Sequence, residues 1–349
     1  MANIERVRGL VDALCDDACA GRRTGSPGGI RARGIMVEAL RDAGLDARVE
    51  PLPSCNGANV LAMIPGDVDR WVLVGAHYDH LGAGAGGAIY RGANDNAAAL
   101  AALVEVARSL TARRPQGRGV ILAAFDAEEP PFYATGAMGS QAMVRTPPVP
   151  LDRIDMMVAL ELVGCAIGPA GLPDAIRNSL FALGAERSEG TAARLDALTS
   201  AGDDLFVRRA DAEVIPPLSD HLAFWEAGVP FMLLTGLRSA TYHTPRDTPD
   251  TLDPARIAAV ARWLEAFVRD QCARPEGRVR FLADGRDDRS TLDAVRALLA
   301  PLAGLSPLTA GALRTAAALT ARLDARNRLG DGERTQLQAL IVGIERALS

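Results

Sequence analysis

Short apolar runs alternate with longer segments rich in Ala and Leu along the first 272 residues of the chain. The apolar runs have the length of β-strands and fall at 58–64, 71–76, 119–125, 156–163 and 229–235. The segments that predict helices are 3–20, 29–44, 95–113 and 252–272. Several of the predicted strands are apolar on both faces, which is typical of a sheet covered by helices on both sides. The pattern therefore predicts a three-layer α/β/α sandwich around a mostly parallel mixed sheet.

The character of the chain changes after Cys272. The stretch Pro275-Glu276-Gly277 indicates a break, and residues 290–349 carry a helical pattern. Ser306 before Pro307 is a typical helix start. We therefore predict a catalytic domain over 1–274 and a helical C-terminal extension over 275–349. The extension is expected to pack on the main domain or on another subunit, as a lid over the site or as a homo-oligomer contact.

Composition, charge and cysteine spacing argue against several classes of function. The formal net charge is −5, so the chain lacks the basic excess typical of nucleic-acid binders. No apolar run is long enough to span a bilayer, and the first residues do not look like a signal peptide. We expect a cytoplasmic location, or a secreted or periplasmic one if an N-terminal segment has been removed. The five cysteines lack zinc-ribbon spacing, and we expect reduced, partly buried thiols.

Polar residues follow the predicted strands at the points where functional groups of parallel sheets gather. They are His77 and Asp79 after 71–76, Asp95 at the start of the next helix, Glu128 and Glu129 after 119–125, Glu161 within 156–163, and His243 after 229–235. Each has an ordinary interpretation when taken singly. Asp95 could be a helix cap, the Glu pair a surface turn, and His243 a solvated loop residue. Their joint occurrence indicates one site.

Two histidines and three carboxylates at one sheet edge form a set of nitrogen and oxygen donors suited to zinc or a similar divalent ion. The carboxylates of Asp95, Glu129 and Glu161 with two neutral imidazoles carry a charge of −3. That charge matches two divalent cations and a hydroxide better than a single cation. We therefore predict two divalent metal ions, zinc in the first place, with Asp79 supporting His77 from outside the ligand set.

The order of motifs His-x-Asp, Asn-Asp-Asn, Glu-Glu, acidic-x-x-Gly and Tyr-His-Thr resembles the co-catalytic zinc aminopeptidases of the MH clan. That family includes bacterial secreted aminopeptidases, the glutamate carboxypeptidase II ectodomain and, more remotely, glutaminyl cyclases. The resemblance covers roughly residues 3–272. It implies that His77 and Glu161 bind one zinc, that Glu129 and His243 bind the other, and that Asp95 bridges them.

The resemblance also implies catalytic roles: Glu128 as general base, Asp79 as support for His77, and Tyr242 as a donor to the oxyanion. Many members have Asp at the position of Glu161. Glu at that position, with the Glu-Glu-Pro-Pro and Met-Gly-Ser stretches, resembles a bacterial subset of the family.

The segment Ser219-Asp220-His221 matches a family segment near the active site. Asp220 and His221 are candidates for substrate binding, with a structural role as the alternative for His221. His80 is interpreted as a solvated loop residue or a pocket wall.

These features predict a metal-dependent aminopeptidase that acts on a peptide or aminoacyl substrate, with no nucleic-acid or membrane partner. A glutaminyl cyclase-like transferase with one zinc uses the same fold and is a second hypothesis. A non-catalytic binding protein is a third, although every position of the site still holds a suitable donor. The preferred side chain depends on loops such as 82–91 and 165–215, which the motifs do not describe.

Overall fold

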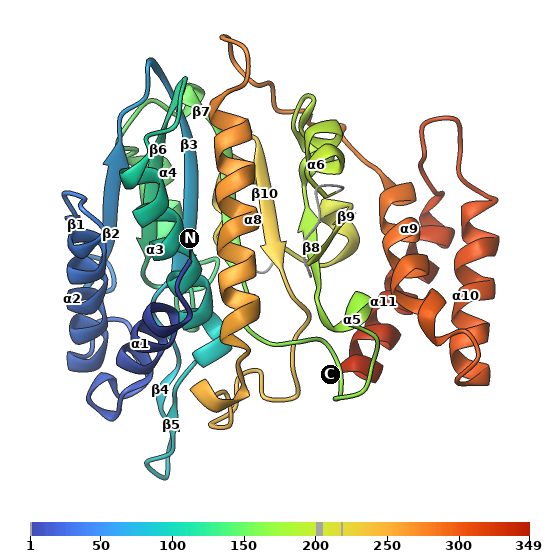
Figure 1. Cartoon of the computed structure of the whole chain (residues 1–349), viewed down its shortest axis with the longest axis horizontal. Helices are drawn as coiled ribbons and strands as arrows, with labels where there is room; N and C mark the ends of the chain where they lie inside the picture. The colour runs from blue at the N-terminus through green and yellow to red at the C-terminus, as the bar shows by residue number, and fades with distance from the viewer. Residues whose placement is uncertain (1, 200–204, 218) are drawn as a thin grey trace.

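The computed structural model describes residues 2–199, 205–217 and 219–349, and its centre is an eight-stranded sheet (Figure 1). The strand order is β1-β2-β6-β3-β7-β10-β8-β9. The strands are β1 (Arg48–Leu52), β2 (Gly57–Ile64), β3 (Val68–His77), β6 (Arg118–Phe125), β7 (Ile154–Glu161), β8 (Ser179–Leu183), β9 (Phe206–Ala210) and β10 (Phe231–Thr235). Neighbours from β6 to β10 run parallel, as do β8 and β9, and the other pairs are antiparallel. The predicted mixed, mostly parallel sheet is confirmed.

Helices cover both faces of this sheet and complete the three-layer sandwich. One core holds residues of α1 (Ile4–Cys15), α2 (Pro27–Asp42), α3 (Ala98–Ala112), α6 (Thr191–Thr199) and α8 (Pro254–Cys272). The other holds residues of α4 (Gly139–Arg145), α5 (Asp174–Arg177), α7 (His221–Glu226), α9 (Asp288–Leu299), α10 (Pro307–Thr320) and α11 (Asp331–Leu348). A small hairpin, β4 (Gly82–Ala83) and β5 (Ile89–Tyr90), projects beyond the sheet. None of the helices in the described part of the chain is long and apolar enough to cross a membrane.

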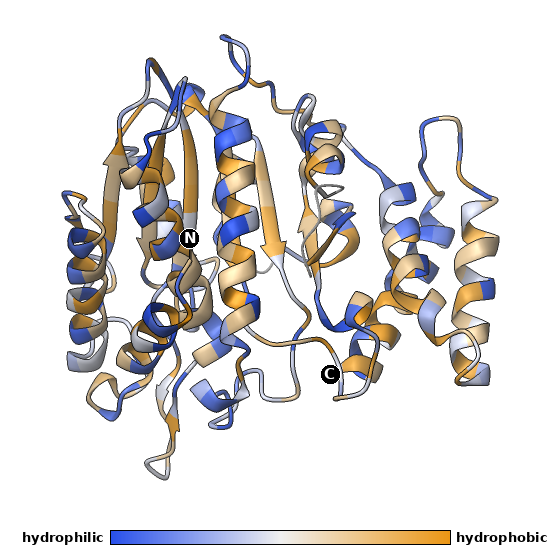
Figure 2. Ribbon diagram, viewed as in Figure 1, coloured by the Kyte–Doolittle hydropathy of each residue, from blue (hydrophilic) through white to orange (hydrophobic). Residues whose placement is uncertain are grey.

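Strand β3 shows why its sequence is apolar without alternation. Val72 and Val74 are buried in one core, while Leu73 between them is buried in the other. Successive side chains of a strand point to opposite faces, so a strand covered on both sides needs apolar residues at every position. The strands are accordingly hydrophobic along most of their length, whereas the helices carry hydrophilic stripes (Figure 2).

Strand register brings the carboxyl ends of the central strands to one edge. His77 pairs with Phe125 across β3 and β6, and Glu161 pairs with Thr235 across β7 and β10. Between β3 and β7, Gly75 pairs with the residue two positions before Glu161. Polar residues at the ends of these strands, or just after them, therefore lie at the same edge of the sheet.

Two predicted helix boundaries are wrong. The helix expected over 3–20 ends at Cys15, because Asp16 is extended and its carboxylate accepts a hydrogen bond from the backbone N–H of Ala18. The helix expected over 95–113 begins at Ala98. Asp95 lies in a separate turn before that helix with φ −118° and ψ 81°, and it is not a cap.

Several local predictions are confirmed. Gly44 follows the end of α2 with φ +84°, a conformation that suits glycine at a helix end. Ser306 starts α10, where its hydroxyl accepts a hydrogen bond from the backbone N–H of Thr309. All five cysteines are free thiols, and four of them are buried.

The C-terminal extension packs on the main domain, which was one of the two expected placements. Leu292 of α9 and Leu337 of α11 are fully buried in the same core as Met157 of β7 and Leu233 of β10. The three helices lie beyond β9 at one end of the sheet (Figure 1). The division of the chain at 274/275 into two domains stays a prediction.

A buried ion pair joins the sheet to the start of the extension. Arg118 of β6 and Asp155 of β7 are each 1% exposed, and Nε of Arg118 lies 2.6 Å from Oδ2 of Asp155. The Arg118 guanidinium also donates to the carbonyls of Arg274 and Gly277, both at 2.8 Å. The Asp155 carboxylate accepts a hydrogen bond from Val279 N–H at 2.8 Å. The segment after α8 is therefore fixed by the same pair that joins two strands.

Replacing Asp155→Ala should destabilise the protein strongly, because Arg118 would keep its charge without its partner. We expect the free energy of unfolding, measured with urea, to fall by about 3–5 kcal/mol. Asp69→Ala is a matched control, since Asp69 forms an exposed pair with Arg153, and it should cost about 0–1 kcal/mol. Equal losses in the two variants would contradict the role of the buried pair.

Candidate active site

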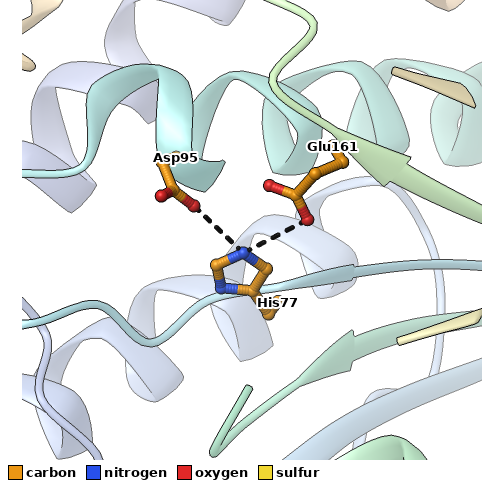
Figure 3. A group of neighbouring side chains, drawn as sticks. All are labelled: His77, Asp95 and Glu161. Carbon is orange, nitrogen blue, oxygen red and sulfur yellow. Dashed lines mark ion pairs between the residues drawn. The ribbon is translucent and has the colours of Figure 1, made fainter. Parts of the chain in front are cut away.

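Three side chains from separate elements meet at the carboxyl edge of the sheet (Figure 3). Nε2 of His77, at the end of β3, lies 3.2 Å from Oδ1 of Asp95 and 3.5 Å from Oε2 of Glu161. Two ligands held about 2.1 Å from a zinc ion in tetrahedral directions lie about 3.4 Å apart. The spacing of this trio therefore fits one divalent ion.

A second trio shares Asp95. Nε2 of His243 lies 3.1 Å from Oδ2 of Asp95 and 3.3 Å from Oε2 of Glu129. Each of these two separations fits a pair of ligands on one ion. Asp95 thus faces His77 with one carboxylate oxygen and His243 with the other. The structure brings together all five residues that were predicted as metal ligands.

Two buried polar atoms of the site make no hydrogen bond within the protein. Nε2 of His77 and Oδ2 of Asp95 are buried and make no hydrogen bond, although each has a polar neighbour close by. Buried polar atoms are costly when they are unpartnered. A cation in the first trio would satisfy Nε2 of His77, and a cation in the second would satisfy Oδ2 of Asp95. The donor set is of the kind that zinc prefers. The residues present therefore fit a divalent metal.

Electrostatics supports the same conclusion. Burial lowers the pKa of His77, but the charges of Glu161 and Glu128 outweigh it and raise that pKa well above its usual value. Burial also opposes protonation of His243, yet its contacts with Asp95 and Glu129 raise its pKa to about 10. Carboxylates in this site thus attract positive charge, which metal cations would supply.

Backbone contacts fix the position of Asp95. The Asp247 carboxylate accepts hydrogen bonds from the N–H groups of Asn94 at 2.9 Å and Asp95 at 3.1 Å. Gly92 has φ +59°, and a Cβ there would lie 2.2 Å from the Asp95 carbonyl oxygen and 2.6 Å from the ring of His80. Only glycine fits at this turn.

Asp79 links the two strand ends that carry His77 and the Glu pair. Its Oδ1 accepts a hydrogen bond from the N–H of Glu128, and its Oδ2 accepts one from the N–H of Glu129, both at 3.1 Å. Its Oδ1 lies 3.6 Å from Nδ1 of His77. Asp79 therefore orients the surrounding groups from outside the two trios.

Glu128 lies beside the first trio. Its Oε2 is 3.8 Å from Nε2 of His77, and it lines a cavity of about 520 Å³ next to the two trios. Burial and the nearby charges of Glu161 and Glu129 raise the pKa of the Glu128 carboxyl well above its usual value, although the charge of His77 opposes them. A carboxylate with a raised pKa takes up a proton readily.

Tyr242 also lines the cavity, and its ring stacks on His243 with 3.9 Å between the ring centroids. Burial and the charges of the neighbouring carboxylates raise the pKa of the Tyr242 phenol. The hydroxyl therefore keeps its proton and can donate a hydrogen bond.

Asp220 and His221 lie outside the lining of this cavity, so their contact with substrate stays a prediction. Both are buried, and burial raises the pKa of Asp220 to about 7 and lowers that of His221 to about 3. The His221 ring lies 5.6 Å from that of Phe231 and 6.5 Å from that of Trp225. These contacts fit the alternative of a structural role for His221.

Sequence reasoning missed the place of His80. This residue is buried, and its Nδ1 lies 2.7 Å from Oε1 of Glu129. His80, Asp95 and Glu129 form a further group whose donor atoms lie within 4.8 Å of one another. The position of His80, three residues after the end of β3, could have indicated its place, because a residue just past a strand end can still face the site. Asp247 was also missed, although it lies four residues after His243.

Several known proteins are similar to this chain in sequence or fold. The protein YfbL of Escherichia coli K12 is 30% identical over 209 residues, which cover 54% of this chain and 63% of YfbL. A protein named "Probable leucine aminopeptidase" from Arthroderma otae is 28% identical over 216 residues, 60% of this chain and 56% of the relative. The chain thus spans less than two thirds of the length of either relative.

The fold is similar to that of the glutaminyl cyclase from Porphyromonas gingivalis, with a TM-score of 0.61 and 19% identity. The similarity covers 77% of this chain and 98% of the cyclase. The family profile described as "Peptidase family M28" matches residues 59–268, more than half of the chain, and includes all five residues of the two trios. The chain belongs to peptidase family M28.

Proposed function

We propose that the protein is a metal-dependent exopeptidase, an aminopeptidase that hydrolyses the N-terminal peptide bond with two divalent ions, zinc in the first place. The observation that carries this proposal is the position of Asp95, whose two oxygens face two different His–carboxylate pairs. His77 and Glu161 would hold one ion, Glu129 and His243 the other, and Asp95 both. When bound, the ions lower the pKa of a water molecule and polarise the carbonyl of the scissile bond.

Glu128 is the residue placed to move the proton. It lies next to the first trio without belonging to either, and its pKa is raised by burial and by neighbouring charge. It would take a proton from the attacking water and pass it to the leaving amine. Tyr242 would donate a hydrogen bond to the carbonyl oxygen as that oxygen becomes negative.

His80 would position Glu129 rather than bind a metal. Its 2.7 Å separation from Oε1 of Glu129 is a hydrogen-bond distance and is shorter than the roughly 3.4 Å expected between two ligands of one zinc. This bond leaves Oε2 of Glu129 turned toward His243, 3.3 Å away. His80 would thereby fix the carboxylate for the second ion.

Replacing Glu128→Gln should abolish measurable release of nitroaniline from a panel of aminoacyl 4-nitroanilides. General-base catalysis contributes about 10²–10⁴-fold, and Gln keeps the shape of the side chain but cannot accept the proton. Metal content, measured by mass spectrometry, should stay at two ions per chain. Glu226→Gln alters an exposed carboxylate and should leave turnover unchanged. A loss of turnover smaller than about tenfold in Glu128→Gln would contradict the mechanism.

The same panel separates the proposal from a glutaminyl cyclase-like transferase. One bound zinc, formation of pyroglutamate from a glutaminyl peptide and no nitroaniline from wild type would reject the peptidase and favour the cyclase. Metal binding without turnover of either substrate class would favour a binding protein.

Replacing His80→Ala should lower the affinity for metal about 10–100-fold, because groups that orient ligands have effects of that size. Titration against a competing chelator measures it. His221→Ala removes another buried imidazole, which belongs to neither trio, and should leave the affinity within about threefold. An unchanged affinity in His80→Ala would contradict its positioning role.

A further inference from the structure

The cavity beside the two trios extends well beyond them. Glu161, Tyr242 and His243 line it near the proposed metal site, and Ala294, Leu298 and Ile341 line it from α9 and α11. The last three lie in the C-terminal extension, after the end of the M28 match at residue 268. Part of the cavity wall is therefore supplied by a segment outside the matched family region.

Strand register shows in which direction the cavity runs. Leu233 of β10 pairs with Leu183 of β8, and Leu183 pairs with Ala210 of β9. All three residues line the cavity, so they form an apolar row that crosses three strands. Strand β9 is three strands away from β7, which carries Glu161, and strands lie about 4.8 Å apart. The row thus leads about 14 Å away from the site.

The walls of this cavity favour an apolar occupant. Among the described residues that line it away from the two trios, the charged side chains are paired. Glu213 pairs with Arg187 and Arg334, and Arg238 pairs with Glu345 at 2.6 Å. A charged ligand would have to compete with these pairs, whereas an apolar group gains by leaving water.

The extension is held in place by several contacts. Nη2 of Arg334 in α11 lies 2.6 Å from Oδ1 of Asp211, which follows β9. The hydroxyl of Thr291 in α9 accepts a hydrogen bond from the N–H of Asp211 at 2.8 Å. Arg209 of β9 bonds Asp287 at the start of α9, also at 2.8 Å. These contacts hold α9 and α11 against β9, where they form a wall of the cavity.

We propose that α9 and α11 complete the pocket for the substrate's first side chain and that this pocket selects long apolar side chains, phenylalanine or longer. The inference rests on the proposed peptidase function. A leucine side chain reaches only about 4 Å from its Cα, so it would leave most of the apolar row uncovered. A longer apolar side chain would reach the wall formed by the extension.

The test compares wild type with Ala294→Phe, which fills the cavity from α9. The substrates are coumarin amides of Ala, Leu, Phe and biphenylalanine. In wild type, kcat/KM should rise at least about tenfold from Ala to Phe and further to biphenylalanine. Ala294→Phe should lower the ratio of kcat/KM for the biphenylalanyl substrate to kcat/KM for the alanyl substrate at least about tenfold. Ala317→Phe adds the same group at an exposed position of α10 and should behave as wild type.

Binding of amino alcohols separates this inference from the peptidase proposal. Alaninol, phenylalaninol and biphenylalaninol have no bond to hydrolyse, and calorimetry should show Kd falling with side-chain length in wild type but not in Ala294→Phe. If Kd falls in this way but no amide is hydrolysed, the peptidase proposal is rejected and the proposed apolar pocket is supported. Hydrolysis with equal kcat/KM for Ala and biphenylalanine, or an Ala294→Phe variant with wild-type selectivity, would overturn the pocket. A cooperative thermal unfolding transition reports that the Ala294→Phe variant is folded.

Discussion

The carboxylate of Asp95 is the group on which the geometry of the site depends. It lies between His77 and His243, which come from a strand end and from a loop more than 160 residues later in the chain. Glu161 and Glu129 complete the arrangement from two other strand ends. Because the parallel strands β3, β6 and β7 end in register, their side chains meet without long connecting loops. Asp95 itself needs a separate support, which Gly92 and Asp247 provide through the backbone.

The extension after α8 contributes both to the hydrophobic core and to the cavity beside the two trios. Its apolar residues join the core on one face of the sheet, and its first segment is fixed by the buried pair of Arg118 and Asp155. The same helices line the cavity that begins at the two trios. A segment outside the matched family region thus supplies both a core layer and a wall of the site.

Much of the fold and site could be predicted from sequence because the strands of the sheet centre are buried on both faces. Their unbroken apolar runs are short and easily recognised in the sequence. A charged residue at the end of such a run, such as Glu161, is costly to bury unless it is paired or bound to a metal. The outer strands β8 and β9 were not predicted. In β9, Arg208 and Arg209 interrupt the apolar pattern, and their partners Ser179 and Asp287 are distant in sequence. His80 was missed for the same reason, since Glu129 lies 49 residues away. The cavity could not be predicted either, because its walls come from strands and from helices α9 and α11 that are far apart in sequence and meet only in the folded protein.

Anomalous X-ray diffraction at the zinc edge would show directly whether the Asp95 carboxylate contacts two ions. Crystals grown with zinc should show two peaks on either side of the Asp95 carboxylate. One should lie between His77 and Glu161, and the other between His243 and Glu129. A single peak contacting Asp95 through one oxygen, or no peak near Asp95, would contradict the account.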